Sequence, residues 1–194
     1  PVDLSAAQLS TALAAGADTE KIAELDAKPL YTFSETDVDV YLGYLRELKP
    51  NLRDRVQHLG QKNIGQPYEI YLLGEFPFET YDPQPLYCLD RSDCVVFAEH
   101  TLAMALSKDW PSFFTTLQRI RYKNGQIGVL TRNHYTESDW DVNNAWLVED
   151  INEELTPKHI WYEQKVDRAR MFKKRYDIDT NIPVEDFRTA YIPA

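Results

Sequence analysis

The chain has 194 residues, of which 43% are hydrophobic and 27% are charged, and its 31 acidic and 21 basic side chains give a formal net charge of −10. This composition is typical of a globular domain and excludes a disordered acidic chain. The negative balance argues against nucleic acid as a partner, because phosphate binding needs clustered Lys and Arg. The longest apolar run, residues 95–106, contains Glu99 and His100, so no membrane span is expected.

Cysteine and histidine are too sparse to predict a disulfide framework or a metal centre. The chain has two cysteines, Cys88 and Cys94, and its four histidines fit no zinc-ligand spacing. We therefore expect no metal and no cofactor. A Cys88–Cys94 disulfide, which would block a nucleophilic thiol, is the lesser alternative to two free thiols.

The first quarter of the chain predicts a helical region, residues 1–54. Helices are expected up to Gly16, from residue 17 to Pro29, from Ser34 to Pro50 and again after residue 51. In the third of these, the apolar residues recur at helical spacing, which indicates one buried face. Asp37 follows Ser34 by three residues but is not the Glu or Gln of a strict capping box.

The middle of the chain combines a long loop with two helices. Residues 65–91 hold four prolines and several Tyr and Phe without a lasting period, which indicates a long structured loop of the kind that often carries function. Residues 93–108 predict a helix that is apolar nearly all round and hence buried. A second helix is expected over residues 109–122.

The last third of the sequence predicts a turn at residues 124–125, followed by a strand over residues 126–132. A second strand is expected over residues 146–151. From residue 156 the pattern predicts helix again, and residues 165–176 within it are expected to form a solvated basic stretch. No internal repeat and no linker is visible. The elements together predict an α+β fold that is rich in helix.

Cys94 is the residue with the clearest chemical potential. It follows Ser92 and Asp93, two residue types that cap helices, and it opens the apolar helix. A thiol in the first helical turn meets unpaired N–H groups and the positive end of the helix dipole, which favour the thiolate. Asp93 opposes this effect unless its carboxylate turns into the cap. Cys94 is therefore either a nucleophile or a buried, inert cysteine.

A cysteine nucleophile needs a base, and His134 is the candidate nearest to a polar cluster. Arg132, Asp139, Trp140 and Asp141 surround it in the sequence. The cluster is either a base with its orienting carboxylate, an aromatic and polar wall for a ligand, or a surface loop. His100 lies six residues after Cys94 and is expected to pack in the core.

Three segments resemble the N-acetylmuramoyl-L-alanine amidase-like family: GQPYEIYLLGEF, LDRSDCVVFAEHTLAMA and FTTLQRIRYKNGQIGVLTRNHYTESDWDVNNAWLVEDI. By this resemblance, the chain looks like a member of a branch of the NlpC-like, papain-type cysteine hydrolases that act on peptidoglycan. The resemblance covers roughly residues 55–194, the expected hydrolase domain. It implies a papain-like α+β fold, of which this chain supplies the N-terminal portion with an incomplete sheet.

The resemblance also implies roles for single residues. Cys94 matches the nucleophile, Asp93 the residue that precedes it, and Tyr68 a tyrosine near the nucleophile. His134, with Arg132, matches a substrate-side block better than it matches the base. The family's catalytic histidine belongs to a later His-x-Gly strand, and no His-x-Gly follows Cys94 in these residues. We therefore expect a further C-terminal segment to complete the fold.

The resulting functional expectation is hydrolysis of an amide bond in peptidoglycan or muramyl-peptide fragments, with Cys94 as the nucleophile. Assisting or substrate-binding roles fall to Tyr68, Asp93, Arg132, His134, Asp139 and Trp140. The alternatives are a non-catalytic module that binds wall fragments and a thiol acyltransferase on the same scaffold. No signal peptide is visible, and a periplasmic or secreted location is implied by the resemblance alone.

Overall fold

The computed structural model describes residues 18–193, which form two units that divide between Ile127 and Gly128. The helix expected to end at Gly16 lies outside these residues. The helix-rich α+β character that the sequence predicts is confirmed, although the sheet has only two strands. None of the helices between residues 18 and 193 combines the length and apolar character that a membrane crossing requires. The predicted domain division between residues 54 and 55 stays a prediction.

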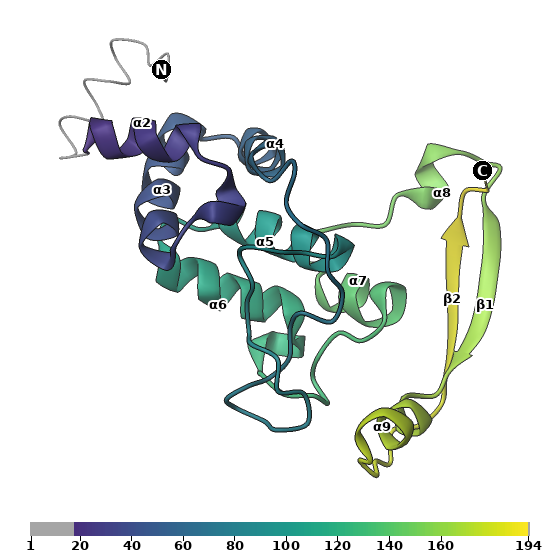
Figure 1. The fold of residues 1–194 in the computed structure, drawn as a ribbon. Coiled ribbons are helices and arrows are strands. Elements are labelled where there is room, and N and C mark those ends of the chain that lie inside the picture. Colours follow the sequence, from purple (N-terminus) through teal and green to yellow (C-terminus); the bar gives the residue numbers. More distant parts are fainter. Residues whose placement is uncertain (1–17, 194) are drawn as a thin grey trace. The chain divides into compact units, whose positions relative to one another are not determined.

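Between residues 18 and 127, the first unit contains five α-helices joined by short connections and one long loop (Figure 1). They are α2 (Thr19–Ala27), α3 (Glu35–Leu48), α4 (Leu52–Lys62), α5 (Cys94–Leu106) and α6 (Trp110–Arg121). Two short 3₁₀ helices, η1 (Leu30–Thr32) and η2 (Lys123–Gly125), also belong to these residues. Each of the five α-helices begins at a residue whose side chain accepts a backbone N–H of the first turn; these caps are Asp18, Ser34, Asn51, Asp93 and Asp109. Four of the predicted helices are thus confirmed within a residue or two, and the fifth, predicted after residue 51, begins at Leu52.

The cap of α3 is stronger than the sequence indicated. The Ser34 hydroxyl accepts the N–H of Asp37, and the Asp37 carboxylate accepts the N–H of Ser34 at 3.1 Å. Asp37 therefore closes a complete capping box in place of the more usual Glu or Gln.

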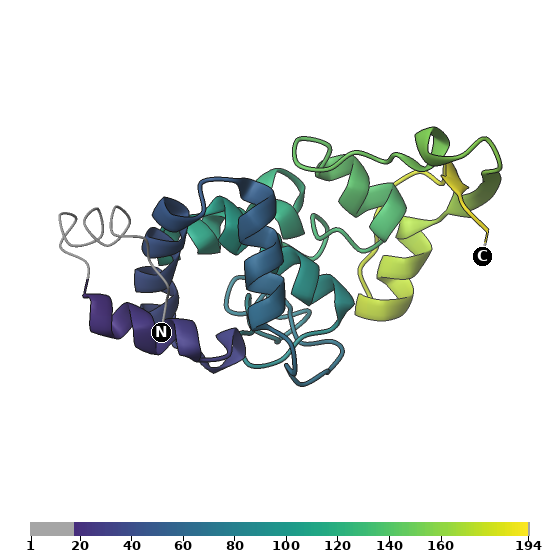
Figure 2. The ribbon, with the colours of Figure 1, turned by 90° about the horizontal axis from the view of Figure 1, so that it is seen from above.

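The core of the first unit lies between these helices, which Figure 2 shows from above. Apolar side chains from α2, α3, α4 and α6 are almost wholly removed from solvent: Leu25, Leu42, Leu45, Leu59, Phe113, Leu117 and Ile120. Burial of this apolar surface is the main favourable term in the folding of the unit. Helix α5 packs against α6 and α4 of this group.

Helix α5 is not buried all round, contrary to the prediction. Val95 and Phe97 in its first turns are 40% and 38% exposed, while Glu99 and His100 are buried. Polar residues can be buried here because they have partners: an Arg121 guanidinium nitrogen lies 3.2 Å from a Glu99 carboxylate oxygen.

Residues 63–93 form the long irregular loop that the sequence predicts, drawn as a coil-like tube between α4 and α5 in Figure 1. Its middle doubles back on itself through backbone hydrogen bonds from Gly74 N–H to Pro85 O and from Glu75 N–H to Asp82 O. A Cβ atom at Gly74 would lie 2.6 Å from Asp82 O, so the close approach of the two arms requires glycine here.

The second unit holds short helical segments and a two-stranded antiparallel ribbon. Its elements are η3 (Thr136–Trp140, a π-helical turn), α7 (Asp141–Asn143), α8 (Asn152–Leu155), β1 (Ile160–Val166), α9 (Arg168–Tyr176) and β2 (Glu185–Tyr191). The ribbon pairs Ile160 with Tyr191 at one end and Val166 with Glu185 at the other. Only Val166 and Ala190 of the ribbon are buried.

The predicted strands of this region are wrong. Residues 126–132 do not form a strand, because the Thr131 and Arg132 N–H groups bond back to Gly128 O and close a turn. This turn follows another at Asn124 and Gly125, whose φ angles are 56° and 70°. Residues 146–151 are turn and coil. The expected helix from residue 156 is correct only for α9, because residues 160–166 pair with β2 instead.

Candidate active site

Cys94 occupies the first position of α5, and its side chain is exposed. Asp93 precedes it in an extended conformation, and the Asp93 carboxylate accepts the N–H of Val96 at 2.8 Å. The carboxylate is therefore turned into the cap, as the nucleophile interpretation requires. Within residues 18–193, the N–H groups of Cys94 and Val95 face no acceptor, so they remain available to an anionic group at the helix start.

Tyr68 lies beside the chain that leads into Cys94. The backbone of the Tyr68 segment pairs with that of Ser92: Ser92 N–H donates to Pro67 O at 3.1 Å, and Glu69 N–H donates to Ser92 O at 3.2 Å. The structure thus brings Tyr68, Asp93 and Cys94 into one neighbourhood. The Tyr68 ring is 71% exposed, so its hydroxyl is accessible to a ligand.

Gln66, which sequence reasoning missed, fastens this neighbourhood. Its amide nitrogen donates to Leu89 O at 2.9 Å, and its amide oxygen accepts the Ser92 hydroxyl at 2.7 Å. One side chain thereby holds both ends of the short segment before the nucleophile. Gln66 is the variable residue of the Gly-x-Pro-Tyr segment, and that segment was used in the sequence only to predict a role for Tyr68.

The surroundings of Cys88 disfavour its thiolate. Both cysteines are free thiols. Cys88 is half-buried, and its Sγ lies 3.1 Å from an oxygen of Asp90. Burial, followed by the hydrogen bond to Asp90, raises the pKa of the Cys88 thiol. A raised thiol pKa leaves less thiolate at neutral pH.

His134 belongs to the second unit and is held by its surroundings. Its Nε2–H donates to Val129 O at 2.6 Å, and its ring packs edge-on against Phe172 with centroids 5.1 Å apart. Burial lowers the pKa of His134 to about 4, with the Val129 hydrogen bond opposing the shift. The imidazole is therefore neutral at pH 7 and a weak base, which favours a positioning or wall role over proton transfer.

Asp139 does not orient the His134 ring. One of its oxygens accepts the backbone N–H groups of His134 and Tyr135, at 3.2 and 3.1 Å, and the other accepts Arg168 at 2.9 and 2.5 Å. Arg168 also reaches Glu185 of β2 at 2.6 Å. The prediction that residues 165–176 are solvated is wrong for Arg168, because the Arg168 side chain is only 14% exposed.

Trp140 lines an open groove with a volume of about 430 Å³, together with four carboxylates: Glu137, Asp141, Glu149 and Asp150. Burial, followed by the charges of Glu137 and Asp150, raises the pKa of Asp141.

Arg132 lies beside His134. Its guanidinium is 5.9 Å from the ring centre of Tyr176 and contributes to the low pKa of His134. Of the residues that surround His134 in the sequence, Arg132 and Asp139 therefore act on it directly, whereas Trp140 and Asp141 line the groove.

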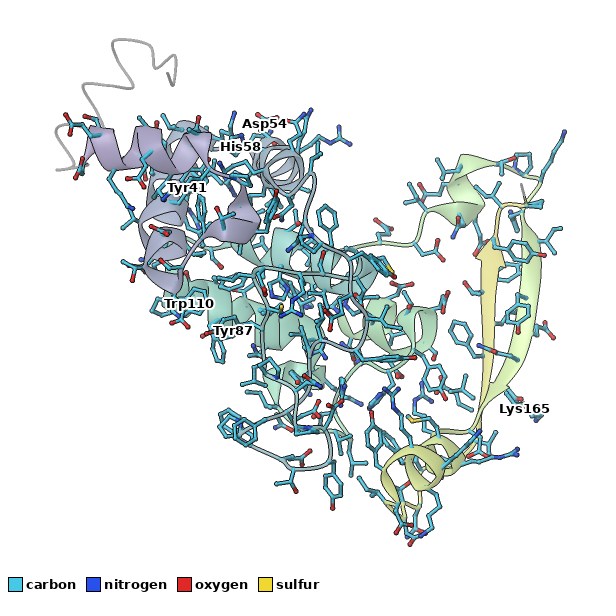
Figure 3. The ribbon with its side chains drawn as sticks, viewed as in Figure 1. Tyr41, Asp54, His58, Tyr87, Trp110 and Lys165 are labelled. Carbon is cyan, nitrogen blue, oxygen red and sulfur yellow. The ribbon has the colours of Figure 1, made fainter. Side chains whose placement is uncertain are left out.

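The remaining histidines are engaged elsewhere. The Nε2 of His100 accepts the Cys88 N–H at 3.3 Å while its Nδ1 lies 2.9 Å from Val96 O, so His100 packs in the core as predicted. His58 lies with Nε2 2.6 Å from the Tyr41 hydroxyl, and Figure 3 shows the two side chains meeting between α3 and α4. His58-Leu59-Gly60 is a His-x-Gly triplet, but it precedes Cys94 and lies within α4, so it is not the strand of the family pattern.

Among residues 18–193, no group of three or more His, Cys, Asp or Glu side chains is arranged to hold a metal ion.

Comparison with solved structures shows the same fold in longer bacterial proteins. A crystal structure of a Legionella pneumophila protein matches with a TM-score of 0.69 and 23% identity, covering 82% of this chain and 64% of that chain. Two crystal structures of an N-acetylmuramoyl-L-alanine amidase from Bacteroides uniformis match with a TM-score of 0.52 each. They are 24% and 25% identical, and the matches cover 65% and 68% of this chain and 53% and 55% of those chains. The chain therefore spans less than two thirds of each of these relatives.

The comparison with protein families is more specific. Comparison with curated proteins gives no match. Residues 58–194, which include every candidate site residue, match the family described as N-acetylmuramoyl-L-alanine amidase-like. This match spans well over half of the chain. The chain belongs to the N-acetylmuramoyl-L-alanine amidase-like family.

Proposed function

We propose that this chain is part of a cysteine-dependent amide hydrolase that acts on peptidoglycan or muramyl-peptide fragments, with Cys94 as the nucleophile. The observation that carries the proposal is the exposed thiol at the first position of α5, with the neighbouring Asp93 carboxylate turned into the cap. The family supplies the substrate class. An NlpC-type, papain-like fold fits a nucleophile at the start of a helix, and we propose it as the finer fold assignment.

The proposed reaction begins when the Cys94 thiolate attacks the carbonyl carbon of the scissile amide. The carbonyl oxygen becomes an oxyanion, which the N–H groups of Cys94 and Val95 are placed to stabilise together with the helix dipole. The C–N bond then breaks, the amine leaves with a proton, and a thioester remains on Cys94. Water hydrolyses the thioester and regenerates the thiol.

The general base is proposed to come from outside the residues described. His134 donates Nε2–H to Val129 O, and His100 accepts the Cys88 N–H, with pKa values of about 4 for both rings. Neither ring is poised to take a proton near pH 7. A further C-terminal segment, covalently joined or as a separate chain, would supply the base and complete the sheet beside β1 and β2. For a cell-wall substrate we propose an extracellular or periplasmic location.

For the second unit, taken by itself, we propose ligand-binding roles. Trp140 forms part of the wall of the 430 Å³ groove, and an indole face packs against the C–H face of a sugar. Arg132 carries a guanidinium beside His134 and would hold a carboxylate or an amide oxygen. Asp139 positions this block through its bonds to Arg168 and to the His134 backbone.

Because His100 and His134 are both held by hydrogen bonds to the backbone, a second candidate function is also favoured: a module that binds wall fragments without cleaving them. The two candidates differ in what happens at Cys94. A binding module would not acylate its thiol, whereas a hydrolase that lacks only its base would still react with an activated acyl group.

Incubation of the 194-residue chain with a muramyl peptide, followed by mass spectrometry of the products, tests the proposal. We expect no sustained turnover by the chain alone, because general acid–base help is worth about 10²- to 10⁴-fold. Addition of the segment that carries the base should restore hydrolysis, and Cys94→Ser should abolish it. If the chain alone turns over substrate and Cys94→Ser abolishes that turnover, the general base lies within the 194 residues, and His134 becomes the leading candidate. A parallel reaction with an amine acceptor separates acyl transfer from hydrolysis.

A further inference from the structure

The loop between α4 and α5 exposes large aromatic side chains at its tip. Phe76, Phe78 and Tyr81 are 54%, 63% and 53% exposed and lie within one turn, residues 75–82, which we call the aromatic turn. Nearer to the candidate site, Tyr68 and Tyr71 are also exposed. Exposed aromatic groups that are gathered in this way mark interaction sites, because scattered single residues do not concentrate apolar surface at one place.

Hydrogen bonds close the backbone of the aromatic turn and anchor it to the core. Its ends meet through Glu75 N–H to Asp82 O at 3.1 Å, and Phe78 N–H donates to Glu75 O at 2.7 Å. Inside the first unit, Glu75 is fully buried, and the Tyr122 hydroxyl at the end of α6 lies 3.1 Å from its carboxylate. A loop whose backbone is already ordered loses less conformational entropy when a ligand packs against its side chains.

A second anchor lies one step earlier in the loop. A guanidinium nitrogen of Arg121 donates to Leu73 O at 2.9 Å, and the same guanidinium contacts Glu99 of α5, the helix that begins with Cys94. Leu73 is 4% exposed. The aromatic turn and the nucleophile helix are therefore tied to the same buried ion pair, so a ligand held by the turn keeps a fixed relation to Cys94.

The negative charge of the loop argues against an anionic partner. Residues 66–90 contain five carboxylates and no Lys or Arg. Attraction to an anionic lipid surface needs clustered basic residues, so a membrane is a poor fit. The exposed surface combines flat rings with few charges, since the Glu69 carboxylate is paired with Arg91 at 2.7 Å and Glu79 is only partly exposed. Such a surface suits a polymer that offers apolar C–H faces and many hydroxyl donors, which is the chemistry of a neutral polysaccharide.

We propose that the aromatic turn is a docking surface for the glycan strand of the peptidoglycan, with the strand running past the turn while a peptide stem reaches Cys94. This inference rests on the proposed function for its substrate class and deepens it, because it makes polymeric wall material the preferred substrate over small fragments. Phe76, Phe78 and Tyr81 pack on pyranose faces.

Co-sedimentation with insoluble peptidoglycan and with neutral glycan strands, for which a β-linked N-acetylglucosamine polymer is the probe, tests this inference. Both use the Cys94→Ala chain, so binding is measured without cleavage. We expect Phe76→Ala/Phe78→Ala and Tyr81→Ala to weaken binding to both polymers by about tenfold or more, as for truncated aromatic anchors. Tyr162→Ala, which removes a 50%-exposed ring from β1, serves as the matched control and should bind normally. Thermal unfolding of each variant checks that the fold is intact.

Three outcomes would overturn the proposal. These are unchanged binding in the turn variants, no binding of glycan strands by the parent chain, or binding to anionic vesicles that depends on the same rings. Self-association that the turn substitutions abolish would assign the surface to a second copy instead. The proposed function is tested separately by the alkylation rate of Cys94 in the turn variants with Cys94 intact, which should not change. Normal glycan binding with an unreactive Cys94 would contradict the nucleophile and leave the docking surface standing.

Discussion

Protonation of His100 should destabilise the first unit in acid, because the folded environment uses its neutral form. Nε2 accepts the N–H of Cys88, and Nδ1–H donates to Val96 O. A proton on Nε2 would set two donors against each other in a site where the ring is only 5% exposed. Burial lowers the pKa of His100 to about 4, the Val96 hydrogen bond opposes the shift, and the charge of Arg121 lowers the pKa further.

The size of the effect follows from linkage. An unfolded histidine has a pKa of about 6.5, so the unfolded chain takes up its proton first and the free energy of unfolding falls as the pH drops from 6.5 towards 4. Between pH 7.5 and pH 4.5 this one group should cost about 2 to 3 kcal/mol, since each pKa unit is worth about 1.4 kcal/mol. The stability contribution is complete above pH 6.5.

Urea unfolding followed by circular dichroism at pH 7.5 and pH 4.5 measures this loss in the parent chain and in His100→Gln. Glutamine keeps a polar side chain but does not titrate. We expect the variant to be less stable at pH 7.5 and to lose about 2 to 3 kcal/mol less than the parent on acidification. All other titrating groups are common to both proteins. An equal loss in parent and variant would refute the reasoning.

Three further predictions concern the candidate site. Cys94 should react with iodoacetamide faster than Cys88 near neutral pH, because Cys94 is exposed at a helix start and burial raises the pKa of Cys88; peptide mapping that finds equal or slower labelling of Cys94 would count against the nucleophile. His134→Ala and Trp140→Ala should weaken muramyl-peptide binding and leave Cys94 alkylation nearly unchanged; a clear loss of thiol reactivity in His134→Ala would assign His134 as the base. Asp93→Ala should lower the free energy of unfolding by about 1 kcal/mol through loss of the Val96 cap, while Asp93→Asn should be nearly neutral; similar losses in both would show that charge, not capping, is the main contribution.

The helices could be predicted from sequence because their signals are local. Asp18, Ser34 and Asp109 each precede an apolar stripe, and the structure places each of them as a cap. The strands could not be predicted from the sequence, because the pairing between Ile160 and Tyr191 joins segments that are far apart in the chain. Residues 126–132 have a strand-like pattern, but the Thr131 and Arg132 N–H groups bond to Gly128 O within the same segment and close a turn there.

The same distinction holds for the candidate site. The setting of Cys94 was visible in its neighbours, because a capping Asp and an apolar helix are local features. The partner of Asp139 was not visible, since Arg168 lies 29 residues away and its own neighbours are basic and exposed. Gln66 was missed for the same reason: its contacts with Leu89 and Ser92 depend on how the long loop returns.

The most direct test of the central claim is to trap the acyl group on the chain. A muramyl peptide whose scissile carbonyl is activated as a thioester removes the need for a base in the first step, so a nucleophilic Cys94 should be acylated even by the 194-residue chain. Intact-mass measurement followed by peptide mapping should locate one adduct on Cys94, and Cys94→Ser should show none while Cys88→Ser is labelled normally. No adduct, or an adduct on Cys88, would contradict the assignment of Cys94 as the nucleophile.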